Sequence, residues 1–192
     1  LYSALSHIND GVRKLITVED PVELRLPGIV QIQTQADIGY TFARALRSIL
    51  RHDPDVIMVG EIRDRETAEI AMQAALTGHL VLATVHTNDA LSAVNRLVDM
   101  GIEPYLVAAA LRAVMAQRLV RRLCPECSQP HTDAASLQAR WRVLRERQPV
   151  LAEMPAEPAW RMAGGCEACG GTGYRGRVGI YELVSVSASM QH

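Results

Sequence analysis

The stretch Val56–Val59 places the strongest constraint on how this chain can fold. It consists of consecutive apolar residues, and a strand without polar alternation is typical of a parallel sheet that is covered on both faces. Strand-like and helix-like stretches alternate from residue 1 to residue 123. Because parallel strands need crossover connections, usually helices, this alternation indicates a doubly wound α/β layer. The sequence therefore predicts a parallel α/β core.

Periodicity, cap residues and turn residues predict the elements around this strand. Further strands are expected at residues 14–18, 29–33, 79–86 and 178–186. The expected helices are a helix tail over Leu1–Asn9, one after Thr41, one over Arg65–Thr77 with Asp64 as its cap, one from Asn88 or Asp89 to Gly101, one within Glu103–Arg122, and one over about Ala134–Arg147.

Acidic residues follow two of the predicted strands. Glu19, Asp20 and Glu23 follow the first strand, and Gly60-Glu61 follows the strand Val56–Val59. Open α/β sheets bind ligands at the carboxyl ends of their strands. Phosphoryl transfer to water needs one carboxylate to help hold Mg²⁺ and another to orient and deprotonate the water. These strand ends could supply both, and Gly60 would let the backbone approach a nucleotide; the alternative is a set of ordinary solvated loop carboxylates.

The cysteines form two CxxC pairs, Cys124 with Cys127 and Cys166 with Cys169. Each pair can supply two thiolates from one tight turn, and four thiolates suit one tetrahedral zinc ion. Since we expect no export signal, metal binding is favoured over disulfides. The alternative is unligated or redox-active thiols. Four thiolates leave no open position, so the predicted zinc ion is structural.

Three blocks resemble signatures of the type II secretion and type IV pilus ATPase family. Residues 50–64, with Val59-Gly60-Glu61-Ile62-Arg63-Asp64 at their end, resemble the Walker B signature. Residues 16–23 resemble the Asp box, and residues 77–87 resemble the His box. The resemblance covers nearly the whole chain. It implies an incomplete RecA-like P-loop NTPase core over residues 1–123, an inserted tetracysteine zinc module over 124–169, and a return to the core over 170–192.

The resemblance also implies roles for individual residues. Glu19 is the candidate general base for the hydrolytic water, and Glu61 is the candidate Walker B carboxylate on the Mg²⁺ side. Which of the two is the base stays open. The other residues that the resemblance associates with nucleotide and Mg²⁺ are Asp20, Glu23, Arg63, His79, His86 and Arg177. The alternatives are a buried strand position for the histidines and a surface position for Arg177.

The 192 residues contain no G-x-x-x-x-G-K-[ST] phosphate-binding loop. In the resembled family this loop comes just before a Leu-Tyr-Ser-Ala-Leu-like helix, and residues 1–5 have that sequence. We therefore expect a fragment that starts after the loop and hydrolyses negligible ATP alone. One competing pattern, Cys166–Gly173, resembles the CxxCxGxG repeat of DnaJ-type chaperones, but those proteins carry several repeats and this chain has one.

The implied function is an ATP-hydrolysing motor of bacterial type II secretion, which drives pseudopilus assembly and protein export. Its implied cofactors are ATP, Mg²⁺ and structural Zn²⁺, and its implied partners are itself, as a homohexamer, and inner-membrane platform proteins. It would be cytoplasmic and peripheral at the inner membrane. The tetracysteine spacing matches secretion members, and retraction-type pilus motors lack it.

Two alternatives stay open: a type IV pilus assembly ATPase, and a non-enzymatic, zinc-stapled protein-interaction module. Nucleic acid is not an expected partner. The chain has 20 basic and 21 acidic residues, and aromatic residues make up only 4%. Nucleic-acid binding surfaces need a surplus of basic side chains.

Overall fold

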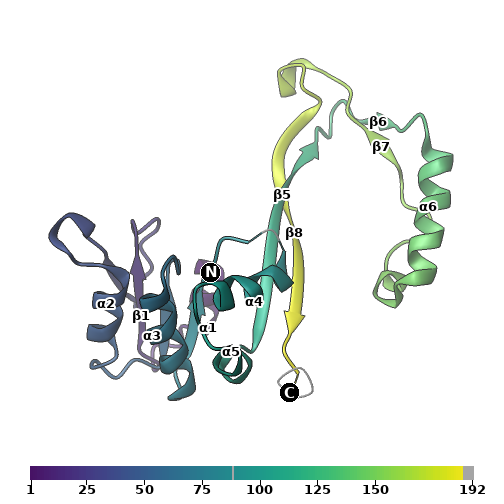
Figure 1. Cartoon of the computed structure of the whole chain (residues 1–192). Helices are drawn as coiled ribbons and strands as arrows, with labels where there is room; N and C mark the ends of the chain where they lie inside the picture. Colours follow the sequence, from purple (N-terminus) through teal and green to yellow (C-terminus); the bar gives the residue numbers. More distant parts are fainter. Residues whose placement is uncertain (88, 188–192) are drawn as a thin grey trace. The chain divides into compact units, whose positions relative to one another are not determined.

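The computed structural model describes residues 1–87 and 89–187 (Figure 1), so the predicted helix start at Asn88 lies outside the described residues. The chain divides into two compact units. We call Leu1–Ala116 with Tyr181–His192 the core unit, and Gln117–Ile180 the cysteine unit. Among the described residues, no helix has the length and apolar character needed to cross a membrane.

The core unit contains a parallel four-stranded sheet with the order β2-β1-β3-β4. Its strands are β1 Leu15–Glu19, β2 Val30–Gln33, β3 Val56–Val59 and β4 Leu80–Ala83. The register places Val18 opposite both Val59 of β3 and Ile32 of β2. All residues of β1 and β3 are buried, whereas β2 and β4 are partly exposed. The predicted parallel α/β core is confirmed.

Helices cover both faces of this sheet because successive side chains of a strand point to opposite faces. On one face, Leu15, Val56 and Met58 pack against Leu5 of α1. On the other face, alternate residues of β1 and β3 join a larger cluster with four helices. The helices of the core unit are α1 Tyr2–Ile8, α2 Phe42–Ile49, α3 Arg65–Leu76, α4 Ala90–Asp99 and α5 Pro104–Ala110, with a short 3-10 helix, η1, at Ala36–Ile38.

Side-chain caps set the start of three of these helices. The Thr41 side chain accepts from the Arg44 N–H at 3.3 Å at the start of α2. Asp64 accepts from the backbone N–H of Thr67 at 2.8 Å and from its hydroxyl at 2.9 Å, at the start of α3. Asp89 caps α4 in the same way. The predicted caps at Thr41 and Asp64 are therefore confirmed. Of the two residues expected to open the next helix, Asp89 is confirmed as its cap.

The predicted helix within Glu103–Arg122 is wrong over most of its length. Helix α5 ends at Ala110, Leu111 is extended, and the chain continues as strand β5, Ala113–Leu123. β5 pairs with β8, Tyr174–Ser185, and the arrows of the two strands point in opposite directions in Figure 1. The apolar residues of this segment fit a helical period, but pairing with a strand distant in sequence overrides that local preference.

The cysteine unit contains α6, Ala134–Arg147, and a small antiparallel sheet of β6 Gln129–Pro130 and β7 Arg161–Met162. Two 3-10 helices, η2 Pro149–Glu153 and η3 Glu167–Cys169, complete it. The prediction of α6 is confirmed. All of residues 117–180 are described, and within them Cys124 is the only buried hydrophobic residue. The unit therefore lacks an apolar core of its own.

Candidate functional site

Two buried carboxylates lie at the carboxyl edge of the parallel sheet. Glu19 ends β1, and Glu61 follows the neighbouring strand β3. Their exposed fractions are 3% and 8%, and carboxylates are rarely buried without polar partners. Both line a cleft of about 250 Å³, together with Tyr2, Asp20, Glu23 and Gly60. Pairing of β1 with β3 thus brings both acidic strand ends to one site.

Neutral donors hold the Glu19 carboxylate. The Thr17 hydroxyl donates to Oε1 at 2.5 Å, and Gln31 Nε2 donates to the same oxygen at 3.1 Å. The Tyr2 hydroxyl donates to Oε2. Thr17 reaches the carboxylate because residues i and i+2 of a strand point to the same face. These three donors satisfy the buried carboxylate and fix its orientation.

The Glu61 carboxylate has cationic or potentially cationic partners. Its Oε2 atom lies 2.5 Å from Arg63 Nε and 3.2 Å from His86 Nε2. The side chains of Arg63 and His86 are 65% and 83% exposed, so water screens both interactions. Glu61 and Glu19 therefore lie in different environments although they share one cleft.

Gly60 allows the ends of β1 and β3 to approach closely. Its N–H donates to the Val18 carbonyl at 2.7 Å. A Cβ at position 60 would lie 3.2 Å from the Val18 oxygen and 3.3 Å from Glu19 Cα. The sequence led us to expect that Gly60 admits a nucleotide, but the described contacts show an approach to the neighbouring strand.

The structure does not bring every predicted site residue to this cleft. His86 follows β4 and contacts Glu61, whereas His79 precedes β4 and thus lies at the opposite edge of the sheet. His79 Nδ1 donates to the Ala74 carbonyl at 2.9 Å, at the end of α3. Arg177 lies exposed on β8 within the cysteine unit. Of the two histidines that the resemblance associates with the γ-phosphate, His86 therefore lies at the edge of the sheet that carries the cleft, and His79 lies at the other edge.

Sequence reasoning missed the donors around Glu19. In the sequence, Tyr2 is notable only as part of residues 1–5, which resemble a helix of the family, and Gln31 only as part of the expected strand 29–33. Thr17 carried a usable signal, since a polar residue two positions before a strand-end carboxylate shares its face. The contributions of Tyr2 and Gln31 depend on tertiary contacts and had no local signal.

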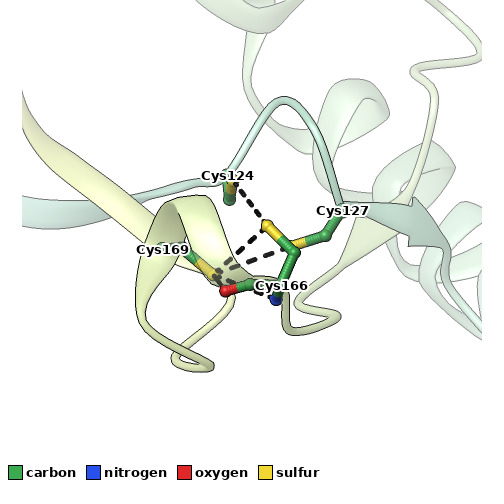
Figure 2. A group of neighbouring side chains, drawn as sticks. All are labelled: Cys124, Cys127, Cys166 and Cys169. Carbon is green, nitrogen blue, oxygen red and sulfur yellow. Dashed lines mark hydrogen bonds between the residues drawn. The ribbon is translucent and has the colours of Figure 1, made fainter.

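The cysteine unit brings all four thiols together (Figure 2). Their Sγ atoms lie within 4.8 Å of one another. The pairs Cys124–Cys166, Cys127–Cys169 and Cys166–Cys169 are separated by 3.9, 3.8 and 3.8 Å. A tetrahedral zinc ion with sulfur ligands at ~2.3 Å requires separations of about 3.8 Å, whereas a disulfide requires ~2.05 Å. The thiols therefore fit a tetrahedral zinc ion and are not disulfide-bonded.

The local backbone distinguishes two of these thiols. Backbone hydrogen bonds, including donation from the Cys166 and Gly173 N–H groups at 3.4 and 3.1 Å, lower the pKa of Cys169 to about 6. Desolvation and hydrogen bonds to the other thiols raise the pKa of Cys127 to about 12. Gly164 allows its backbone to lie close to the backbone of Cys127, because a Cβ at position 164 would lie 2.2 Å from the Cys127 carbonyl oxygen. Of these two thiols, Cys169 is therefore the one that ionises near neutral pH.

Comparisons with known proteins agree with this arrangement. The chain is 55% identical over 185 residues to the type II secretion system protein E of Pseudomonas aeruginosa, covering 96% of this chain and 35% of that protein. It is 51% identical over 188 residues to the type IV pilus assembly ATPase PilB of Myxococcus xanthus, covering 96% and 31%. The crystal structure of the pilus retraction motor PilT with bound ADP matches with a TM-score of 0.57 and 29% identity, covering 93% and 40%.

The chain spans about a third of the length of the curated relatives that it matches. The family described as "Type II/IV secretion system protein" matches residues 1–192. The acidic strand ends, the sheet that carries them and the resemblance of the three sequence blocks all agree with this match. The chain belongs to the type II/IV secretion system protein family.

Proposed function

We propose that the whole protein hydrolyses ATP to drive bacterial type II secretion, through pseudopilus assembly and protein export. The observation that carries this proposal is the pair of buried carboxylates, Glu19 and Glu61, at adjacent parallel strand ends in one cleft. Relatives named as type II secretion and pilus assembly proteins support it. Type IV pilus assembly is the second candidate, since PilB is nearly as similar as protein E.

The different environments of the two carboxylates favour different roles. Glu19, which neutral donors hold, would accept the proton of the attacking water. Glu61, whose charge Arg63 partly balances and whose Oε2 atom also contacts His86, would lie on the side of Mg²⁺. Asp20 and Glu23 line the same cleft and offer the oxygen ligands that Mg²⁺ prefers. When bound, Mg²⁺ would neutralise the negative charge that develops on the phosphate oxygens during hydrolysis.

The tetracysteine group would hold a structural zinc ion. Its sulfur separations suit tetrahedral coordination, and four thiolates leave no position for substrate. This zinc ion would organise the module that we assign to residues 124–169. By resemblance, the tetracysteine spacing favours the secretion and pilus assembly motors over the retraction-type motors.

The proposal includes the partners and the location that the family resemblance implies. The whole protein would act as a homohexamer in the cytoplasm, peripheral at the inner membrane, where it would contact the platform proteins. ATP-driven movement would act on those proteins. The rival from another class is a zinc-stapled interaction module that hydrolyses nothing.

The deciding experiment measures steady-state ATP hydrolysis by the whole protein, with its phosphate-binding loop, and by its Glu19→Gln and Glu61→Gln variants. We expect each substitution to lower kcat by about 10²–10⁴-fold, with ATP binding retained. Glu146→Gln, at an exposed position on α6, is the matched control. Unchanged turnover in both site variants would leave the acidic strand ends as scaffold, whereas no ATP hydrolysis by the whole parent protein would favour the interaction module. The 192 residues alone should hydrolyse negligible ATP.

A further inference from the structure

The hydroxyl of Tyr2 joins the candidate base to the loop that follows it. It donates to Glu19 Oε2 and accepts from the backbone N–H groups of Glu23 and Leu24 at 3.0 and 3.4 Å. Tyr2 belongs to α1, so these contacts connect a helix, the end of β1 and the acidic loop. A buried tyrosine hydroxyl usually has one hydrogen-bond partner. The Tyr2 hydroxyl donates one hydrogen bond and accepts two, which uses its proton and both of its lone pairs.

These contacts fix the direction in which the Tyr2 proton points. A phenolic hydroxyl has one proton and acts as both donor and acceptor. The Glu23 and Leu24 N–H groups occupy the acceptor side of the oxygen. The proton is then directed at the Glu19 carboxylate. Burial, together with the hydrogen bond to Glu19, raises the pKa of Tyr2, so the hydroxyl stays protonated at neutral pH.

The same contacts distinguish the two oxygens of Glu19. Oε1 accepts from both Thr17 and Gln31, which occupies its two lone-pair directions. Oε2 accepts from Tyr2 and retains one direction. Gln31 is itself fixed, because its amide nitrogen also donates to the Leu24 carbonyl and its oxygen accepts from the Leu26 N–H.

We propose that Tyr2 is a positioning residue that holds Glu19 so that the remaining direction of Oε2 faces the cleft and accepts the proton of the hydrolytic water. This inference rests on the proposed function. Tyr2 does not touch the reacting atoms; it acts through Glu19. Proton transfer depends on the base lying within hydrogen-bond reach of the proton that it abstracts, so a carboxylate free to rotate would act more slowly.

The test uses the whole protein and MgATP, with the variants Tyr2→Phe, Tyr105→Phe and Glu19→Gln. Tyr2→Phe retains the aromatic ring and removes only the hydroxyl. We expect it to lower kcat by about 10- to 100-fold, the range that loss of one hydrogen bond to a charged group implies. The KM for MgATP should change less than about twofold, because ground-state binding is untouched. Tyr105, which is 68% exposed on α5, is the matched control and should match the parent protein.

Kinetics per folded molecule separate positioning from general damage to the fold. Loss of positioning should lower kcat per folded molecule, with the folded fraction taken from circular dichroism, and should leave the KM for MgATP nearly unchanged. Loss of folded protein would lower the total rate in proportion to the folded fraction and leave kcat per folded molecule unchanged. A parent-like kcat for Tyr2→Phe, beside an inactive Glu19→Gln, would refute the positioning role alone. Full turnover of Glu19→Gln would refute Glu19 as the base and this inference with it, whereas no ATP hydrolysis by the parent protein would refute the proposed function itself.

Discussion

Removal of zinc should unfold the cysteine unit and leave the core unit folded. Within residues 117–180, all of which are described, only one hydrophobic residue, Cys124, is buried. One fully buried apolar side chain contributes only ~1.5–3 kcal/mol, and small domains without a sufficient core usually depend on a metal or disulfides. The core unit, in contrast, contains two clusters of buried apolar residues on the two faces of its sheet.

The free energy of zinc binding sets the expected size of the effect. Structural zinc sites contribute about 10–16 kcal/mol at neutral pH, which is comparable to the whole stability of a typical domain, ~5–15 kcal/mol. Other contacts of the unit include the hydrogen bond of Trp141 Nε1 to the Pro155 carbonyl at 2.9 Å and the ring contact of Trp141 with Trp160. Chelation should therefore unfold the unit completely rather than loosen it.

Tryptophan fluorescence reports on this unit selectively, because both tryptophans, Trp141 and Trp160, lie within it. Their rings are 6.3 Å apart in an edge-to-face arrangement. Titration with a zinc chelator should shift the emission to longer wavelength and open residues 117–180 to proteolysis, while circular dichroism retains the signal of the core unit. Cys166→Ser should reproduce this state, and Ser136→Ala, at an exposed position on α6, should not.

Two results would contradict this reasoning. Less than stoichiometric zinc in elemental analysis of the purified whole protein would show that the thiols do not form the expected site. Alternatively, tryptophan emission and protease resistance that persist after complete zinc removal would show that the other contacts of the unit hold it together without zinc. Either result would also remove the basis for a structural zinc module.

Three further predictions follow from individual contacts. Gly60→Ala should lower the free energy of unfolding by about 1–3 kcal/mol in urea titrations, because the added methyl group overpacks the β1–β3 contact, and it should also lower kcat. Asp64→Ala should cost about 0.5–2 kcal/mol in the same titration, since the first turn of α3 loses its cap; kcat per folded molecule should not change. Zinc binding should release protons as the thiols ionise, fewer at pH 8 than at pH 6.5, because Cys169, with its pKa of about 6, is closer to full ionisation at the higher pH; calorimetry in buffers of different ionisation enthalpy measures this release.

Local sequence predicted the parts of this fold that depend on few distant contacts. The apolar run Val56–Val59 and the caps at Thr41 and Asp64 appear in the structure as expected. The helix expected over most of segment 113–123 is absent, because this segment forms strand β5, whose conformation depends on pairing with β8, about 60 residues later. The sequence did not separate the two histidines either: the expected strand 79–86 contained both, whereas in the structure His79 precedes β4 and His86 follows it.

The chemistry available to this protein can be read from its sequence: acidic residues at the ends of two apolar strands, and four cysteines in two pairs. Residue type and local periodicity are sufficient for that. Tertiary contacts were needed to show that Tyr2 and Gln31 direct donors at Glu19, that Gly60 lies close to Val18 and Glu19 of the neighbouring strand, and that the four thiols lie at separations suited to zinc. These features depend on distances between segments remote in sequence, and no local pattern encodes such distances.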